Sequence, residues 1–344
     1  MTEFEHIPVL LQPVLELLRP EGCRRLVDGT LGGAGHAAAL LAAAPADAEL
    51  LGSDRDDAAL AAARARLAPF APRVHLVRGS YAQMAEFAAA LGWEDATVDA
   101  ILLDLGVSSP QIDTPDRGFA HRFDGPLDMR MDRRQRLTAA TLLNHTPEAE
   151  LARIFREYGE EPQARRLAHA IVERRERQPW ERTAELAALV GKVAGRPFQR
   201  GLPAATRVFQ ALRIAVNGEL AELRAGLAAA LRLLRPGGRL AVISFHSLED
   251  RIVKEFIRHE ALSCVCPPGL PVCVCQKQAT LRPVTKKPVT AAAAELAANR
   301  RAAPAKLRVA ERLPVAAAPA PSLSRQPSTP RPPPERRAGT PTPP

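Results

Sequence analysis

Residues 24–36, RRLVDGTLGGAGH, decide the fold of this chain. An apolar run, a carboxylate at Asp28 and a glycine-rich loop precede an alanine-rich segment, a pattern typical of a strand that turns into a helix around an adenosine-bearing ligand. A second apolar run over residues 49–53 ends at Asp54, about one strand–helix unit later. We therefore expect the first two strands of an open α/β sheet, with Asp54 placed to bind ribose hydroxyls.

The glycine loop by itself leaves more than one class of ligand open. The spacing Gly33-x-Gly35-x-x-Ala38 also fits the fingerprint of a nicotinamide dinucleotide. The carboxylate of Asp28 would repel a pyrophosphate, but it suits S-adenosylmethionine, which carries an ammonium and a sulfonium and no phosphate. A methyltransferase is therefore favoured over a dehydrogenase, and a non-catalytic RNA-binding assembly factor is a third alternative.

Further strands are predicted from apolar runs over residues 74–77, 98–104 and 239–246, and a last antiparallel strand from the alternation over 306–312. The run 98–104 ends in Asp104. Because the carboxyl ends of parallel strands meet at one edge of the sheet, we expect Asp104 to face the same crevice as Asp28 and Asp54. Tyr81 follows the third strand, where an aromatic ring could lie against adenine.

An inserted helical domain is predicted over residues 113–207, because the alternation of strands and helices stops there for too long to be a simple connection. The sheet domain would then comprise residues 1–112 and 208–313. Within the insert we expect one helix from Pro147 to Gly159, one over 164–178 with a basic face, and one from Thr183 to Gly195.

Two more helices are expected in the sheet domain. A long amphipathic segment over 209–231 would return the chain to the sheet and stop at Arg235-Pro236-Gly237-Gly238, and a helix over 248–259 would follow the fifth strand. Residues 314–344 are rich in Pro, Ala and Arg with almost no large apolar side chains, so they predict a disordered tail.

The net charge of +9 is unevenly distributed along the 344 residues. Residues 1–112 hold 8 basic and 15 acidic side chains, residues 113–207 hold 18 and 14, and residues 208–344 hold 21 and 9. A cationic ligand in the first part and a polyanionic partner for the others would account for this asymmetry, although solvated arginines alone would also do so. The acidic start and the lack of an apolar stretch of about 18 residues predict a cytoplasmic protein without a membrane segment.

Several longer strings carry a resemblance to a known family. They are DGTLGGAGH, SDRD, ILLDLGVSSPQID, RGF, GPLDMRMD, YGEE, TRVFQALRIAVNGEL and LRPGGRLAVISFHSLEDRIVK. Together they resemble the bacterial 16S ribosomal RNA cytosine-N4 methyltransferase family, also called MraW or RsmH, over nearly everything from Ile7 to about Leu313. The resemblance implies a Rossmann-like S-adenosylmethionine-dependent methyltransferase that acts on 16S ribosomal RNA at cytidine 1402 of the decoding region.

The resemblance also implies which residues bind S-adenosylmethionine: Ala34, Gly35, His36, Asp54, Tyr81, Asp104 and Gln111. Asp28 joins this set from the residue-level argument about charge. Alternatively, His36 could be a helix-start residue that does not touch the ligand.

The chemistry follows from the poor nucleophilicity of the cytosine amine, whose lone pair is delocalised into the ring. The enzyme must hold the amine in line with the methyl group and accept its proton. Asp104 is the candidate for orienting the amine or accepting that proton, with Ser108, Ser109 and the Ser244-Phe245-His246 segment as residues that form the pocket. The target base must be single-stranded or splayed from its stack.

Four of the five cysteines are clustered as Cys264-Val-Cys266 and Cys273-Val-Cys275, with Cys23 as a lone small hydrophobic residue. Clustered thiols in a chain without an export signal favour metal over disulfides. Structural zinc more often has two to four residues between paired ligands than one, so a loop with reduced thiols is the alternative. No metal is expected in the catalytic site.

Overall fold

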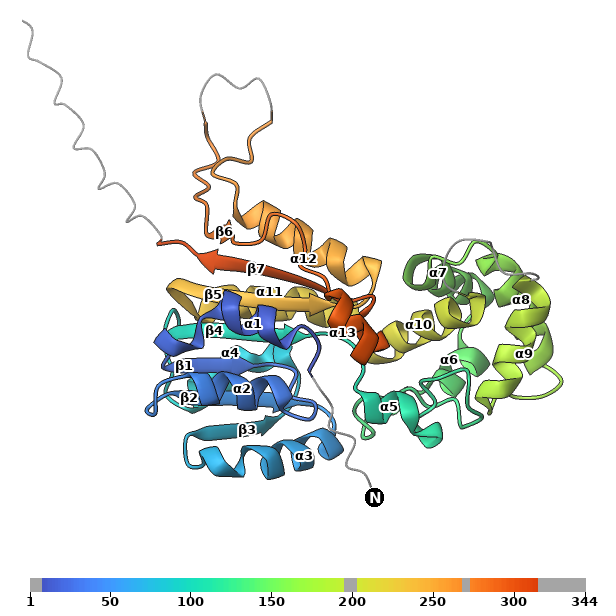
Figure 1. Cartoon of the computed structure of the whole chain (residues 1–344). Helices are drawn as coiled ribbons and strands as arrows, with labels where there is room; N and C mark the ends of the chain where they lie inside the picture. Colours follow the sequence, from blue (N-terminus) through green and yellow to red (C-terminus); the bar gives the residue numbers. More distant parts are fainter. Residues whose placement is uncertain (1–7, 195–202, 268–272, 315–344) are drawn as a thin grey trace, which may run out of the picture.

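The computed structural model describes residues 8–194, 203–267 and 273–314, and it contains one seven-stranded sheet (Figure 1). The strands run in the order β3-β2-β1-β4-β5-β7-β6 across the sheet. Their bounds are Arg25–Asp28 (β1), Glu49–Asp54 (β2), Val74–Arg78 (β3), Val98–Asp104 (β4), Leu234–Ser244 (β5), Leu281–Pro283 (β6) and Lys306–Arg312 (β7). Strands β1 to β5 are parallel, and β7 is antiparallel to both of its neighbours. The predicted Rossmann-like α/β class is confirmed, as is the antiparallel strand over 306–312.

Helices cover both faces of the sheet, which explains why its strands are continuously apolar. One face packs against α1 (Leu11–Leu18), α2 (Gly35–Ala43) and α3 (Asp57–Leu67), and the other against α4 (Met84–Ala90), α11 (Glu219–Leu233) and α12 (Ser247–Glu260). Successive strand residues alternate between the two cores: Leu102 belongs to the first and Leu103 to the second. A short helix, α13 (Ala293–Ala298), precedes β7.

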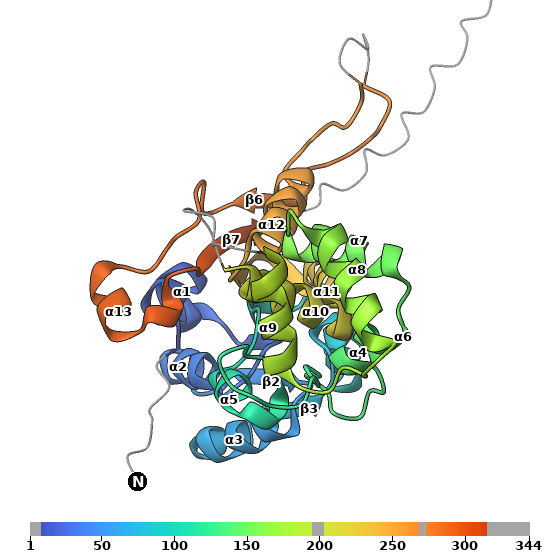
Figure 2. The same ribbon diagram turned by 90° about the vertical axis from the view of Figure 1, so that its right-hand side faces the viewer.

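A helical unit lies beyond the end of the sheet at which β4 leads into α5 (Ser109–Asp113) (Figure 1). It consists of α6 (Ala139–His145), α7 (Glu148–Gly159), α8 (Ala164–Arg175), α9 (Thr183–Ala194) and α10 (Ala204–Asn217). These helices enclose a core of their own, which includes the fully buried Phe155 and Trp180. Seen from that end of the molecule, the helical unit lies in front of the sheet (Figure 2).

The long amphipathic segment over 209–231 is in fact two helices, α10 and α11, separated by Gly218. Gly218 has a φ of 63°, a left-handed conformation that ends α10 and changes the direction of the chain. Phe209 of α10 packs in the core of the helical unit, whereas Leu227 of α11 packs against the sheet. The boundary expected at residue 208 therefore falls inside α10, and the change from one core to the other occurs at Gly218.

The Arg-Pro-Gly-Gly sequence at 235–238, predicted as a turn after this helix, lies within β5. Val98 pairs with Leu234 and Ala100 pairs with Arg239, so residues 235–238 form a bulge between two paired positions. The two glycines permit this because Gly237 has a positive φ and Gly238 packs tightly against backbone oxygens of β4. At its other end β5 stops at Ser244, two residues before the predicted end.

Several predicted helix ends differ by a few residues. Pro147 precedes α7 as its N-cap, and α7 continues through Gly159 because Glu160 adopts the left-handed conformation that ends it. Helix α8 ends at Arg175. The predicted end of α9 at Gly195, and the tail over 314–344 apart from its first residue, lie outside the described residues. Among the described helices, none combines the length and apolar character needed to span a bilayer.

Candidate active site

Three aspartates from different strands meet at the carboxyl edge of the sheet, as predicted. Asp28, Asp54 and Asp104 are the last residues of β1, β2 and β4. Thr30 connects two of them: its backbone N–H donates to Asp28 Oδ1 at 3.0 Å, and its Oγ1 accepts the N–H of Asp104 at 2.6 Å. The sequence argument gave Thr30 no role, although it lies within the quoted glycine-loop motif.

Burial makes these three carboxyls reluctant to ionise. Asp28 is only 2% exposed, and its desolvation, together with the charge of Asp54, raises its pKa to about 7 despite the hydrogen bonds from Thr30. Burial likewise raises the pKa of Asp54, although backbone N–H groups of Asp56 and Gly32 oppose the shift. The space between these three carboxyls is therefore a place where a cation would be stabilised and a phosphate would not.

Asp104 is the most perturbed of the three. Burial, then the charges of Asp28 and Glu249, raise its pKa well above the usual range. Its Oδ1 is buried and has no hydrogen-bond partner within the described part of the chain, yet a quarter of its side chain is exposed. A ligand can therefore reach the exposed part of Asp104, whereas Oδ1 must first be uncovered before it can bond.

The glycine loop holds its shape through contacts with β2 and with the start of the chain. The N–H of Gly32 donates to Asp54 Oδ2 at 2.9 Å, which fixes the loop over the end of β2. Ala34 is buried with a φ of 56°, and Gly35, which opens α2, has no room for a side chain because Pro8 occupies that space. Gly35 is therefore required by packing against Pro8, whereas Gly32 and Gly33 have open space beside them.

His36 points from α2 into the interior, and it makes no side-chain cap on its helix. Its Nε2 lies 2.9 Å from the carbonyl oxygen of Val9, and its Nδ1 lies 3.6 Å from Asp104 Oδ2. His36 is thus the second residue of α2 and also lies beside the candidate catalytic carboxyl.

Tyr81 begins the short 3-10 turn Tyr81–Gln83 after β3, and its ring packs across two glycines. A β-carbon added to Gly29 or to Gly226 of α11 would overlap the side chain of Tyr81. Burial also raises the pKa of the Tyr81 phenol. The sequence argument missed Gly226, although a glycine in the middle of an amphipathic helix signals a close approach of another group.

Asp56 joins the cofactor edge to the connection that leads into the helical unit. Its Oδ1 caps α3 by accepting the N–H of Ala58 at 3.0 Å. Its Oδ2 accepts Gln111 Nε2 at 3.0 Å and Arg117 Nη1 at 2.7 Å, and Gln111 Oε1 in turn accepts the N–H of Ser108. Both ends of the Gln111 amide are thus held by protein groups, and Asp56, which sequence reasoning passed over, is the centre of this network.

A hollow of about 220 Å³ lies beside this network, where the ends of β2 and β3 face the connection between β4 and α6. Its charged lining is mainly basic and includes Arg55, Arg78, Arg117 and Arg133. The Nε of Arg78 is buried without a hydrogen-bond partner in the described structure. Three of these arginines form ion pairs, Arg55 with Glu222, Arg78 with Asp57 and Arg117 with Asp56, so beside the three acids the same edge offers cations that are partly neutralised.

We expected the polar end of β5 to form part of the pocket. It does not form an open pocket wall. The hydroxyl of Ser244 donates to the carbonyl of Lys306 in β7, at 3.4 Å. His246 caps α12 by accepting the N–H of Glu249 at 3.4 Å, and its Nε2 lies 3.1 Å from Glu249 Oε1. Only Phe245 reaches toward the edge, since its ring packs against Gly106. Ser108 and Ser109, predicted to form the pocket, lie at the start of α5, where Ser108 is the N-cap.

The carboxylate of Glu249 holds the segment that follows β5. It accepts the N–H of Phe245 at 2.8 Å. Although burial raises the pKa of Glu249, hydrogen bonding to His246 and the charge of Arg213 hold it below the usual range. A buried negative charge therefore lies close enough to Asp104 to help keep that carboxyl protonated.

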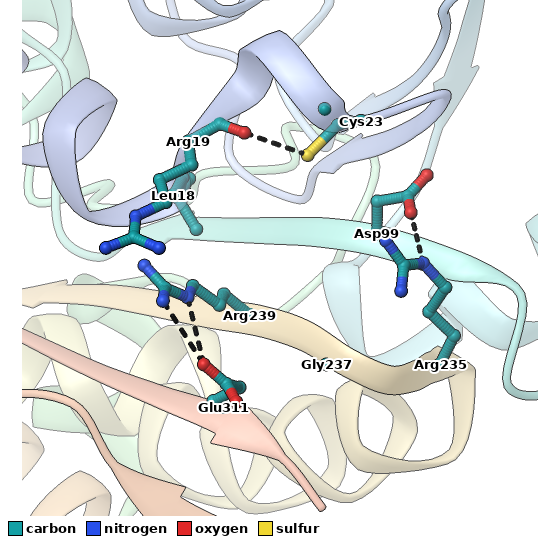
Figure 3. Close-up of a pocket in the computed structure, with 9 residues that line it drawn as sticks. Leu18, Arg19, Cys23, Asp99, Arg235, Gly237, Arg239 and Glu311 are labelled. Carbon is teal, nitrogen blue, oxygen red and sulfur yellow. Dashed lines mark hydrogen bonds and ion pairs between the residues drawn. The ribbon is translucent and has the colours of Figure 1, made fainter.

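A second hollow, of about 250 Å³, lies at the opposite edge, where β1, β4 and β5 begin (Figure 3). Four of its five charged groups form two ion pairs, Arg235 with Asp99 and Arg239 with Glu311, and the fifth is Arg19. The lone Cys23 is here, with its thiol directed at the carbonyl of Arg19. None of the predicted ligand-binding residues lines this hollow, so these residues belong to the carboxyl edge and not to the edge where the strands begin.

Comparison with known proteins gives matches over most of the chain. The profile of the MraW methylase family matches residues 3–313. "Ribosomal RNA small subunit methyltransferase H" of Heliobacterium modesticaldum is 51% identical over 311 residues, which cover 90% of this chain and 99% of that protein. The protein of the same name from Geobacter sp. strain M21 is 50% identical over 314 residues, covering 91% and 100%. A solved SAM-dependent O-methyltransferase from Thermotoga maritima aligns over 92% of this chain and 71% of its own, with a TM-score of 0.39 and 10% identity.

Proposed function

The chain belongs to the MraW methylase family, and from this membership we propose that it transfers a methyl group from S-adenosylmethionine to the exocyclic N4 of a cytidine in 16S ribosomal RNA. Its curated relatives carry the name of small-subunit ribosomal RNA methyltransferases, and the chain is an enzyme of that class. The proposed target is cytidine 1402 of the decoding region. Membership of a methyltransferase family decides against the nicotinamide dehydrogenase that the glycine loop alone left open.

The observation that carries the proposal is the convergence of three aspartates at one edge, Asp28 buried and the other two partly buried, with the Oδ1 of Asp104 left without a partner in the described structure. S-adenosylmethionine fits this edge because it is cationic and bears ribose hydroxyls. Asp54 would hold the hydroxyls: each of its oxygens accepts one backbone N–H and keeps a second lone pair. The loop around Ala34 and Gly35 would supply close backbone contacts.

His36, Tyr81 and Gln111 complete the proposed set of cofactor-binding residues. His36 would act through Asp104, 3.6 Å away, and Gln111 through Asp56, which it holds at 3.0 Å. Tyr81 is partly buried against α11, so we propose that it forms part of the surface against which the adenosine lies.

Asp104 is proposed to orient the cytosine amine and to accept its proton. When bound, S-adenosylmethionine supplies a methyl group activated by its sulfonium. The backbone N–H of Asp104 is held by Thr30, and its buried Oδ1 has no partner in the described structure. A carboxyl whose pKa is raised by burial is a stronger proton acceptor than an ordinary aspartate once it is ionised, and a cation beside it promotes that ionisation.

The RNA would approach from the side of the helical unit. The basic hollow beside Asp56 is suited to backbone phosphates, and residues 113–207 have 18 basic and 14 acidic side chains. The cytosine must leave its stack to reach Asp104, because the carboxyl lies at the end of β4 with only a quarter of its side chain exposed, and not on a flat surface. We further propose that the substrate is the RNA within the small ribosomal subunit, in the cytoplasm.

The test is methyl transfer to small subunits from cells that lack the gene, followed by mass-spectrometric mapping of modified nucleosides. We expect N4-methylcytidine at the proposed position. Replacement of Asp104 by Asn should slow transfer by about 100-fold or more. Asp95, an exposed aspartate in the loop before β4, provides the matched control, and Asp95→Asn should transfer normally. Methylation of a different atom would overturn the N4 assignment, and normal turnover by Asp104→Asn would remove Asp104 from the mechanism.

A further inference from the structure

The sulfur atoms of Cys264, Cys266, Cys273 and Cys275 converge in the loop between α12 and β6. All four lie within 4.8 Å of one another. Cys273 Sγ is 3.5 Å from the sulfurs of both Cys264 and Cys275, and the separations from Cys273 to Cys266 and from Cys275 to Cys264 are 3.8 Å. The four thiols are free, and these distances are far longer than the roughly 2.05 Å of a disulfide.

The separations match a single tetrahedral metal ion. A tetrahedron with metal–sulfur bonds of about 2.3 Å, the value for zinc thiolates, has sulfur–sulfur edges of about 3.8 Å. An iron–sulfur cluster distributes its four cysteines over several irons, so some of their sulfurs must be much farther apart. Four sulfur ligands in this geometry suit zinc, and a single iron ion would give the same separations, so metal analysis distinguishes the two.

The backbone explains how pairs separated by one residue can form such a site. The N–H of Val265 donates to Cys275 Sγ at 3.3 Å, and the N–H of Val274 donates to Cys266 Sγ at 3.4 Å. Each Cys-Val-Cys segment therefore supports a sulfur of the other, and N–H donors of this kind stabilise thiolate charge. The short spacing, which counted against zinc in the sequence, is compensated by this reciprocal arrangement.

The exposure of the loop gives a second argument. The four sulfurs point toward one another, while Val265 and Val274 expose 47% and 72% of their surface. Cys264 and Cys273 are themselves exposed, so burial of apolar surface does not hold the sulfurs together, whereas a shared metal ion would.

We propose that Cys264, Cys266, Cys273 and Cys275 bind one zinc ion as thiolates and that the ion fixes the loop that projects from the end of α12 (Figure 1). The base of this loop is closed by Glu260, whose carbonyl accepts the N–H of Thr280 at 2.8 Å. Four protein ligands leave no open coordination position, so the zinc is structural and takes no part in methyl transfer. Binding releases the thiol protons, and affinity therefore rises with pH.

Metal analysis of the full-length chain, purified without added metal, tests the proposal. We expect about one zinc per chain. The double variant Cys264→Ser/Cys275→Ser should retain less than a tenth of the zinc bound by the wild-type chain. The control Cys23→Ser alters the fifth cysteine, in the hollow where β1, β4 and β5 begin, and should retain all of the zinc. Absence of stoichiometric zinc, iron in its place, or disulfides found by thiol titration would overturn the proposal.

A second measurement keeps the test decisive if the double variant does not fold. Cobalt(II) exchanged into the wild-type chain should give the intense visible absorption of a tetrahedral thiolate site, and stoichiometric zinc should abolish it. A weak octahedral spectrum would refute the proposed ligand set. We also expect chelator treatment to expose the loop to protease while binding of S-adenosylmethionine persists, a result independent of whether the RNA substrate is correctly assigned.

Discussion

The acidic edge predicts that binding of S-adenosylmethionine is coupled to release of a proton from Asp28. With a pKa of about 7, Asp28 is half protonated at neutral pH in the free protein. A positive charge held about 6 Å away, at an effective dielectric constant of about 20, favours the carboxylate by about 3 kcal/mol, or about two pKa units. Below pH 7 the cofactor must displace a proton that is absent above it. Affinity should therefore rise about tenfold between pH 6 and pH 8.

The assay is isothermal titration calorimetry at pH 6, 7 and 8, in pairs of buffers with different ionisation enthalpies so that proton release is counted directly. S-adenosylhomocysteine is the matched ligand, because it lacks the sulfonium charge and should show a weaker pH dependence. Asp28→Asn is the matched variant. Asp54, Asp104 and His36 remain in both proteins, so the difference between them reports Asp28 together with its effect on the pKa of Asp104. Equal affinity at all three pH values, or the same slope in Asp28→Asn, would refute the reasoning.

Two further predictions concern residues that hold the edge together. Asp56→Ala removes a helix cap and leaves the nearly buried Arg117 without its carboxylate, so it should lower the free energy of unfolding by about 3–5 kcal/mol in urea titrations. The neighbouring Asp57→Ala, at an exposed position, should cost less than about 1 kcal/mol, and equal losses would argue against the network. Gly226→Ala should displace Tyr81 and weaken cofactor binding in calorimetry, whereas Gly191→Ala, with open space around it, should not.

The strands and their common edge could be predicted because local signals decide them. Each of the parallel strands β1, β2 and β4 is an apolar run that ends in an aspartate, and sheet geometry then brings Asp28, Asp54 and Asp104 together. Burial of both faces by helices made the apolar runs continuous, so they were easy to recognise.

The features that escaped prediction depend on contacts between distant parts of the chain. Asp56 and Arg117 are 61 residues apart, and the local sequence around either residue does not indicate that the two form an ion pair. The direction of Ser244 is set by its pairing with Lys306 in β7, a strand that is weakly signalled by the sequence. The break at Gly218 interrupts an apolar periodicity that runs on without a change, so only the left-handed backbone marks the end of α10.

The sulfur cluster shows the same limit in a different form. The sequence gives the number and spacing of Cys264, Cys266, Cys273 and Cys275, and by spacing alone zinc was the less favoured of two alternatives. Only the reciprocal hydrogen bonds of the two Cys-Val-Cys segments bring all four sulfurs to one point. Spacing rules assume one particular loop geometry, and this loop uses another.

A crystal structure of the chain with S-adenosylmethionine would test most directly whether the carboxyl edge is built for a cationic methyl donor. We expect the ribose hydroxyls on the Asp54 carboxylate, and the sulfonium on the side of the cofactor that faces Asp28 and Asp104. Cofactor bound at the opposite edge, in the hollow between Arg19 and Arg235 (Figure 3), or distant from all three aspartates, would contradict that expectation.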